Sequence, residues 1–476
     1  LDSCTNYKLY VDKAVELGQK AICFSEHGNI YNNIEKKMYA NSKGLKYLHG
    51  VEVYLTAALE PKQRDNYHTI LIAKNFEGVK EINTLVDLST QSDHMYYKPR
   101  ITFDEFFNIS DNVIKISACL ASPLSKYPNF IGKLVDEKIA ELEKNKETEA
   151  NRLYTELNSE AARNQLIEDI TIIHNTSYEI YVEQCIEKSN NAFDLQIEEA
   201  KSELENAKIV YDKLMKTYDY YEIQPHVKSM DQIRYNKMLY EASKKYNKPL
   251  IAGTDTHSID SYKAECRSIL QKAKHIEFSN EDEFDLTYKS YDELVDMFKQ
   301  QGSLPMNVVL EAIENTNRMA DSVTDYELDT AFKYPILYDN EEEVFVERIY
   351  RMYHEKLDKG IIQPDPRYEE NIKEELRVFK KIGMVGFMLF MSELVCWCWD
   401  NGIPIGFCRG SVGGSTIAYL TDIIDVNPVV WNTVFSRFAN EDRKEIGDID
   451  LDIAPSQRHL VYEHIIEKFG ADKTAY

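Results

Sequence analysis

Short apolar runs alternate with amphipathic stretches along the first part of the chain. From residue 7 to about 133, helical stretches such as YVDKAVELGQK are followed by apolar runs such as AICFS, HTILIAK and NVIKISA. Short apolar runs predict buried strands, and their alternation with helical segments is typical of a parallel sheet or a βα barrel. The same rhythm returns at YYEIQPH and KPLIAGTDTHS. We therefore predict an α/β domain, with a parallel sheet or a βα barrel, over residues 1–275.

A long charged segment interrupts this rhythm. Residues 134–216 contain neither proline nor glycine, and stretches such as LQIEEAKSELENAKIVYDKLMKTY place apolar residues at helical spacing among Glu and Lys. This pattern predicts an inserted helical hairpin. Because most of its surface is charged, we interpret it as a solvated spacer or a partner-binding arm without chemistry of its own.

The remaining residues, 276–476, predict a second, α+β region preceded by a helical linker. Helical spacing covers 290–300, 306–322, 341–359 and 368–382, and Pro335 marks a break. The apolar run GMVGFMLFMSELVCWCW, which starts at residue 383, contains Glu393 and is shorter than the ~20 residues that a membrane span needs. It therefore predicts a buried helix.

Two motifs in this second region point to phosphate chemistry. In GFCRGSVGGSTIAYL, residues 406–420, glycines precede a helix, and such a turn presents backbone N–H groups to an anion. In the following GDIDLD, side chains alternate along a strand, so Asp448, Asp450 and Asp452 share one face and need a cation. Two Mg²⁺ ions held there would activate a hydroxyl and steady a leaving pyrophosphate, which is the chemistry of nucleotidyl transfer.

Candidate metal ligands follow the predicted strands of the first domain. Imidazole, carboxylate and thiolate groups in such numbers favour two or three Zn²⁺, Mn²⁺ or Fe²⁺ ions that activate a water for attack on a phosphodiester. The candidates at the strand ends are Glu26, His27, Glu52, His68, Cys119, His226, Asp255 and His257.

These first-domain motifs also carry a resemblance. AICFSEHGNI, HGVEVYL, YHTILIAKN, ISACLASPL, YYEIQPH and LIAGTDTHSID resemble the successive motifs of the polymerase-and-histidinol-phosphatase (PHP) domain that opens bacterial C-family replicative polymerases. The resemblance implies a distorted βα barrel that binds a metal cluster and, as in some members, removes mispaired 3′ ends. The LDS at residues 1–3 matches the tail of the family's first motif, which makes Asp2 a further ligand candidate.

The second half resembles the palm of the same polymerases, the DNA polymerase III alpha subunits, from residue 383 to about 453. By this resemblance Asp448 and Asp450 are metal ligands, with Asp452 as a third candidate. Phe407 and Cys408 replace the family's Pro-Gly, and Gly447 replaces its Pro. The residues expected to contact the phosphates of the incoming nucleotide are Arg409, Gly410, Ser411, Gly414 and Ser415.

Composition restricts how such a chain binds DNA. The 80 acidic and 56 basic residues give a formal charge of −24, so any contact with nucleic acid must come from local Lys and Arg clusters. The eight cysteines show no CxxC pair, which is typical of reduced thiols in a cytoplasmic protein.

We therefore expect template-directed DNA synthesis with Mg²⁺ in the palm and Zn²⁺ or Mn²⁺ in the PHP domain. The expected partners are primer-template DNA and dNTPs, with a sliding clamp and other replisome proteins bound through further regions, and no membrane. Both ends of the chain look cut, so we expect no synthesis by these residues alone. The alternatives are a free-standing PHP phosphoesterase and an inactive polymerase-like scaffold.

Overall fold

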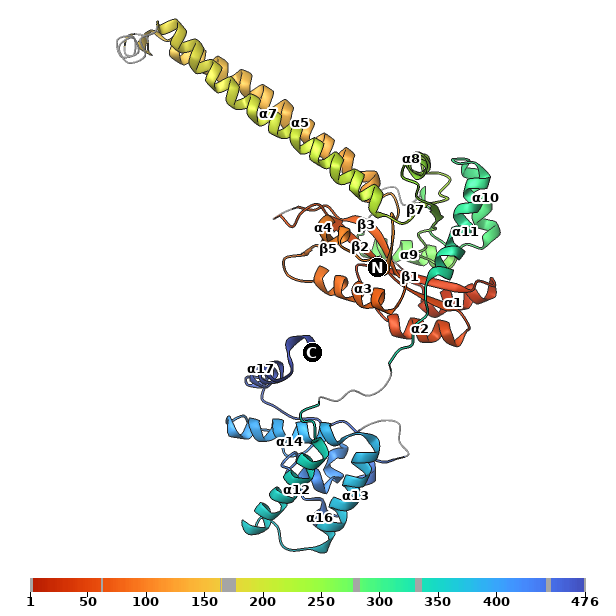
Figure 1. Cartoon of the computed structure of the whole chain (residues 1–476), viewed down its shortest axis with the longest axis vertical. Helices are drawn as coiled ribbons and strands as arrows, with labels where there is room; N and C mark the ends of the chain where they lie inside the picture. Colours follow the sequence, from red (N-terminus) through yellow and green to blue (C-terminus); the bar gives the residue numbers. More distant parts are fainter. Residues whose placement is uncertain are drawn as a thin grey trace. The chain divides into compact units, whose positions relative to one another are not determined.

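The chain forms two compact units, Leu1–Glu327 and Leu328–Tyr476, which are described here one at a time (Figure 1). The structure is a computed structural model that describes residues 3–60, 63–162, 164, 177–276, 283–329, 336–441 and 447–474. Two features of the sequence lie outside these ranges, namely the candidate ligand Asp2 and the break at Pro335.

A mixed sheet forms the centre of the first unit. Its long strand β2 pairs in parallel with β1 and β5 and antiparallel with β3, and β3 pairs antiparallel with β6. A parallel bridge between Ile116 and Tyr220 links β6 to the small parallel pair β7–β8. The strands are β1 Ala21–His27, β2 Lys46–Thr56, β3 Tyr67–Ala73, β4 Met95–Tyr96, β5 Lys98–Thr102, β6 Val113–Ile116, β7 Tyr221–Ile223 and β8 Leu250–Ala252.

The prediction of an α/β unit is confirmed, but the expectation of purely parallel strands is wrong. Only residues 57–66 connect β2 to β3. A parallel crossover needs about a dozen residues or more, usually including a helix, whereas a shorter loop returns the chain antiparallel. The strand β3, which carries His68, therefore runs against β2, which carries Glu52.

Helices cover this sheet and enclose a core that includes Val51, Leu71, Ile101 and Phe106. Most of these helices begin at a polar cap, for example Asn6 before α1 and Asp260 before α9. The helices are α1 Tyr7–Glu16, α2 Asn33–Ser42, α3 Phe76–Ser89, α4 Phe103–Phe107, α5 Pro123–Leu157, α7 Tyr178–Thr217, α8 Met230–Tyr246, α9 Ser261–Ala273, α10 Tyr291–Gln301 and α11 Met306–Ser322.

The helices α5 and α7 run side by side and project from the sheet (Figure 1). Ion pairs join them at two levels, with 2.8 Å between Lys138 Nζ and Glu203 Oε1 and 2.5 Å between Lys146 Nζ and Asp194 Oδ1. The first helix begins well before residue 134, because the Ser122 side chain accepts a hydrogen bond from the Leu124 amide and proline follows at the first helical position.

The first compact unit extends beyond the boundary predicted at residue 275, because it includes α10 and α11. Val309, Ala312 and Ile313 of α11 lie in its core. The Asn315 side chain donates to the Leu250 carbonyl at 2.8 Å, which ties α11 to β8. Helical spacing locates such a helix but cannot tell which core its apolar face covers.

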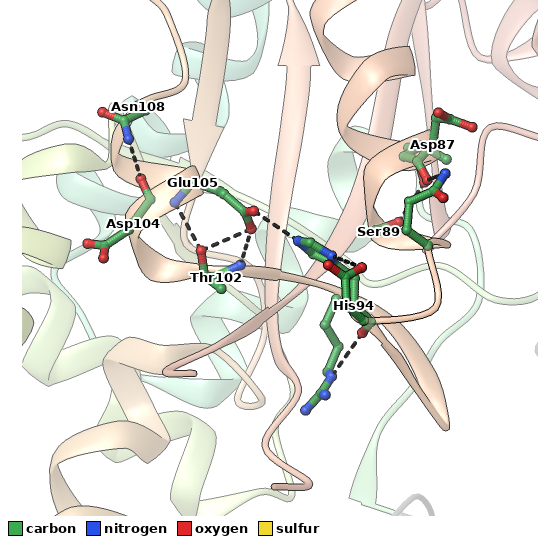
Figure 2. A network of polar contacts seen from close by, with 11 residues as sticks. Asp87, Ser89, His94, Thr102, Asp104, Glu105 and Asn108 are labelled. Carbon is green, nitrogen blue, oxygen red and sulfur yellow. Dashed lines mark hydrogen bonds and ion pairs between the residues drawn. The ribbon is translucent and has the colours of Figure 1, made fainter. Parts of the chain in front are cut away.

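A buried histidine network stabilises the edge of the sheet near β5. His94 lies 2.8 Å from Asp93 Oδ1 and 2.9 Å from Glu105 Oε1, through its two ring nitrogens. Figure 2 shows this ring directed toward Glu105, whose carboxylate also accepts hydrogen bonds from Thr102. Burial alone would lower the pKa of His94, but the hydrogen bonds and charges of the two carboxylates outweigh it and raise the pKa.

This network predicts pH-dependent stability. A raised pKa in the folded state means that the imidazolium stabilises the fold below about pH 6.5, the ordinary histidine value, and that this stabilisation is lost as the pH rises through the folded pKa. We expect His94→Gln to lower the free energy of unfolding more at about pH 6 than at about pH 9, measured by urea denaturation. Glu105→Gln should show the same trend. A difference from wild type that stays constant with pH would contradict this assignment.

The second unit is mainly helical. Among its described residues there is one β-bridge, an antiparallel one between Ile405 and Ile453. Its core includes Phe345, Ile372, Met388 and Ile417. The helices are α12 Glu341–Asp358, α13 Pro366–Ile382, α14 Val385–Asp400, α15 Thr416–Leu420, α16 Pro428–Trp431 and α17 Arg458–Phe469, with short 3₁₀ turns at η2 Ser411–Gly414, η3 Phe435–Arg437 and η4 Ala471–Lys473.

The apolar run from residue 383 forms α14, as predicted, with Met388, Leu389 and Cys398 fully buried. Glu393 lies at its edge and pairs with Lys468 at 2.7 Å. Within the described ranges, no single helix is long and apolar enough to span a membrane. The pair α13 and α14 reaches that length and composition only together, and the two helices are bent by 116° to each other.

Candidate functional site

Three strands of the first unit bring His27, Glu52 and His68 together. Parallel pairing places His27 opposite Glu52, and antiparallel pairing places His68 opposite Tyr54. The Nδ1 atoms of His27 and His68 lie 2.9 and 2.8 Å from Glu52 Oε1. One ligand atom from each of the three residues lies within 4.8 Å of the others. Two imidazoles and a carboxylate at this spacing fit a transition-metal ion such as Zn²⁺.

The charge of this trio is centred on Glu52, which is only 5 % exposed. Burial would raise the pKa of Glu52, but the charge of His68 and hydrogen bonds from both histidines outweigh burial and hold the pKa well below its usual range. The Tyr54 hydroxyl lies 3.1 Å from His27 Nδ1 and so helps to orient that ring. The carboxylate is therefore ionised at neutral pH, as a metal ligand must be.

Cys119 and His257 border the same cluster. Cys119 Sγ lies 3.7 Å from His68 Nδ1, and the ring centroids of His27 and His257 are 5.5 Å apart. His257 Nε2 lies 3.2 Å from Asp255 Oδ1. Burial raises the pKa of the Cys119 thiol, and the charges of Asp255 and Glu52 add to this effect. The structure thus brings these predicted side chains together, although Glu52 lies within β2 and His68 near the start of β3, not at the strand ends where the sequence predicted them.

Backbone conformation contributes to this convergence. Ala118, which precedes Cys119, has φ 59°, and Asp255 has φ 48°. Residues with a side chain rarely adopt positive φ, and such conformations cost roughly 1–3 kcal/mol unless the surrounding fold fixes them. Both lie just beyond a strand end, where they turn ligand candidates toward the cluster.

Glu26, which the sequence predicts as a ligand, lies on the other face of its strand. Successive side chains of a strand point to opposite faces, so Glu26 cannot share the face of His27 in β1. Its carboxylate instead pairs with the buried Lys36 of α2. The sequence shows Glu26 next to His27, and only the alternation within the strand separates their roles.

His226 lies deeper, and Glu222 was not predicted. His226 Nε2 lies 3.1 Å from Gln224 Oε1, and burial lowers the pKa of His226 to about 4. Glu222 of β7 is buried, and burial raises its pKa to about 8, with added repulsion from Asp255 and Glu52. The alternation of Glu222, Gln224 and His226 in YEIQPH was the signal for a carboxyl group on the same face.

The acidic stretch of the second unit is extended, although it is not part of a ladder. Asp448, Asp450 and Asp452 are exposed, while Ile449 and Leu451 pack against the core. The predicted alternation is therefore confirmed in burial. A Cβ atom at residue 447 would lie 2.4 Å from the Phe438 carbonyl oxygen, so only glycine fits immediately before these aspartates.

Arg409 connects the glycine-rich loop to these aspartates. Its Nε lies 3.6 Å from Asp450 Oδ2, and its Nη1 lies 3.3 Å from Asp452 Oδ1. The Gly406 amide donates to the Asp452 carbonyl at 2.9 Å. Gly410 has φ 78°, which glycine adopts without strain. Because Arg409 is about two-thirds exposed at 64 %, these pairs add little stability, but they bring a guanidinium and two carboxylates to one place.

Two predicted phosphate contacts are instead internal. Ser415 is fully buried and donates from its Oγ to Glu375 Oε2 at 2.6 Å. A Cβ atom at Gly414 would lie 2.4 Å from the Val434 carbonyl oxygen, so this glycine permits close packing. Ser411 and Gly410 remain at the loop surface beside Arg409. Glu375 was not predicted. It lies far from the loop in sequence, and the residues around it follow the pattern of an ordinary amphipathic helix.

Comparison with known proteins gives matches in both units. Residues 343–476 match the family model of the bacterial DNA polymerase III alpha NTPase domain, and residues 1–168 match that of the PHP domain. The chain is similar to DNA polymerase III subunit alpha of Aquifex aeolicus (strain VF5), with 26 % identity over 499 residues, covering 100 % of the chain and 37 % of the relative. The corresponding subunit of Borreliella burgdorferi is 26 % identical over 494 residues, covering 100 % of the chain and 36 % of that relative.

The chain thus spans little more than a third of the length of these curated relatives. The matches follow the order of the two motif sets found in the sequence, with the PHP motifs first and the loop and aspartates second. With a matched family model in each unit and similarity along its whole length, the chain is similar to about a third of the length of the bacterial DNA polymerase III alpha subunits.

Proposed function

We propose that this chain acts in template-directed DNA synthesis by two-metal nucleotidyl transfer. The observation that carries the proposal is the meeting of Arg409 with Asp450 and Asp452 at a glycine-rich loop. Carboxylate oxygens are the donors that Mg²⁺ prefers, and the exposed carboxylates of residues 448, 450 and 452 fit such ions. Bound Mg²⁺ would supply activation of a primer 3′-OH and stabilisation of the leaving pyrophosphate.

The loop residues have separate parts in this proposal. Arg409 offers a forked set of N–H donors that matches phosphate oxygens. Gly410 lets the backbone approach a ligand, and Ser411 adds a hydroxyl at the start of η2. The substrates are dNTPs and a primer-template, and the partners include a sliding clamp and other replisome proteins. A free-standing phosphoesterase would leave this loop and the aspartates without a role.

In the first unit we propose a PHP-type metal centre in a distorted βα barrel, which removes mispaired 3′ ends as a 3′–5′ exonuclease. His27, Glu52 and His68 would hold a Zn²⁺ or Mn²⁺ ion, with Cys119, Asp255 and His257 beside them. Such an ion would supply an activated water for phosphodiester hydrolysis. Glu52 and Tyr54 orient the imidazoles for this task.

Nucleotide binding tests the role of Arg409. We expect Arg409→Ala to weaken binding of a dNTP with Mg²⁺ by about 10- to 100-fold, because a hydrogen bond to a charged group contributes about 1.5–3 kcal/mol. Equilibrium dialysis with a radiolabelled dNTP measures the affinity. Arg351→Ala is the matched control, because Arg351 is an exposed arginine of the same unit that pairs with Glu355 of its own helix. Equal affinities in wild type and Arg409→Ala would contradict the assignment.

A further inference from the structure

Glu375 is a buried carboxylate that lies against the end of the glycine-rich loop. It comes from α13, and it is 1 % exposed. Its Oε1 accepts a hydrogen bond from the Thr416 amide at 2.8 Å. Its Oε2 accepts from Ser415 Oγ at 2.6 Å and from the Ile417 amide at 3.0 Å. Three donors at the junction of loop and helix thus converge on one side chain.

Neighbouring bonds extend this connection. Asn371, one turn earlier in α13, donates from Nδ2 to Thr416 Oγ1 at 2.8 Å. Ser415 Oγ, while donating to Glu375, accepts from the Ala418 amide at 3.0 Å. The loop end is therefore held to α13 by side chains at two successive turns, and the hydroxyl of Ser415 has both its donor and acceptor roles filled.

The other parts of the loop are fixed at separate points. Gly406 donates to the Asp452 carbonyl at 2.9 Å, and the Gly413 carbonyl accepts from Thr433 Oγ1 at 2.9 Å. Between Gly406 and the junction held by Glu375 lie Arg409, Gly410 and Ser411. The ion pairs of Arg409 with Asp450 and Asp452 are exposed, and such pairs constrain a loop only weakly. The position of these residues therefore depends largely on the two anchored ends.

We propose that Glu375 is a positioning residue that fixes the loop end at residues 415–417 and thereby holds Arg409 and Ser411 in place for the triphosphate of a nucleotide. The inference rests on the proposed function of the loop, since it assigns Glu375 no contact with the nucleotide itself. The amides of Thr416 and Ile417 donate to the Glu375 side chain, so they are not available to a ligand.

The carboxylate has a property that an amide cannot reproduce. Oε1 and Oε2 both accept backbone N–H groups, so a glutamine in either orientation turns its NH₂ toward an N–H donor and leaves at least one buried amide without an acceptor. Burial raises the pKa of Glu375 to about 7, against the opposing effect of its three hydrogen bonds. Burying a carboxyl group is costly, and Glu375 is buried with its hydrogen bonds satisfied. This is what we expect of a residue that holds the loop end in one conformation.

The test compares Glu375→Gln with Ile372→Ala in the 476-residue chain. Ile372 is fully buried in the same helix, and its side chain makes no hydrogen bond to the loop, so its substitution lowers stability alone. We expect Glu375→Gln to weaken binding of a dNTP with Mg²⁺ about tenfold, and Ile372→Ala to leave the affinity within about twofold at an equal or larger fall in melting temperature.

Hydrogen exchange supplies a readout that needs no ligand. We expect the amides of residues 409–417 to exchange at least about tenfold faster in Glu375→Gln and to keep their wild-type rates in Ile372→Ala. Unchanged exchange or unchanged affinity in Glu375→Gln, with weakened binding in Arg409→Ala, would overturn the positioning role alone. Equal weakening by Ile372→Ala would also overturn it. Unchanged binding in Arg409→Ala would contradict the proposed function of the loop, while the exchange rates would still decide whether Glu375 fixes it.

Discussion

Asp450→Asn should abolish nucleotide incorporation by the complete gene product without unfolding it. Asp450 is about half exposed, at 49 %, so replacing its carboxylate removes charge from the surface and leaves the core intact. Metal-held charge in a phosphoryl-transfer site stabilises the transition state by several kcal/mol, and each ~1.4 kcal/mol is tenfold in rate. We expect a loss of at least about a hundredfold in primer extension with Mg²⁺, and the same for Asp448→Asn.

Asp400→Asn is the control for this prediction. Asp400 is an exposed aspartate at the end of α14, in the same unit, and it belongs to neither the loop nor the acidic stretch. It should extend primers at the wild-type rate, and circular dichroism should give the same spectrum for all variants. Near-normal extension by Asp450→Asn would remove the acidic stretch from the catalytic machinery.

The acidic stretch of residues 448–452 shows which structural features a local sequence pattern can predict. Alternation alone predicted that Asp448, Asp450 and Asp452 share one face, and their exposure beside the inward Ile449 and Leu451 agrees. The pattern could not predict that, within the described part of this stretch, the β-bridge forms at Ile453, because its partner Ile405 is distant in sequence. Local periodicity fixes the direction of side chains, whereas ladders depend on the fold.

The contact between Glu375 and Ser415 is a feature that a local sequence pattern cannot predict. A glycine-rich turn before a helix predicts an anion at the helix N-terminus, but the carboxyl group of Glu375 already accepts hydrogen bonds from the amides there. Nothing in the spacing of α13 distinguishes Glu375 from the solvent-exposed Glu374 next to it, which pairs with Arg377. Which of two adjacent glutamates is buried follows from the rotation of α13 against the core, and that rotation is a tertiary property.

The strand β1 of the first unit gives a second example of what the sequence could and could not predict. Apolar runs with ligand-type residues led us to expect His27, Glu52, His68 and Cys119 in one site, and the structure brings them together, although Glu52 lies within β2 and His68 near the start of the antiparallel β3. Glu26 was included on the same reasoning, although the alternation of side chains places it on the other face of β1 from His27. Glu52 and Glu26 therefore offer a matched pair of variants.

Glu52→Gln should lose the transition metal that wild type binds, and Glu26→Gln should keep it. Glu52 Oε1 lies within 2.9 Å of two imidazoles, so an amide there removes the one charged donor of the trio and weakens any bound ion. Loss of one ligand among three should lower metal affinity at least about 10- to 100-fold, the range seen even for groups that merely support ligands. Elemental analysis of protein purified in the presence of Zn²⁺ or Mn²⁺ measures the metal per chain.

Glu26→Gln makes the same chemical change one residue from His27 but on the other face of β1, where the carboxylate pairs with Lys36. Because Lys36 is buried, this variant also loses some stability, and the comparison with Glu52→Gln is therefore made well below both melting temperatures. Equal metal loss in the two variants would show that Glu26 reaches the ion after all. Full metal content in Glu52→Gln would exclude the trio of His27, Glu52 and His68 as the metal site.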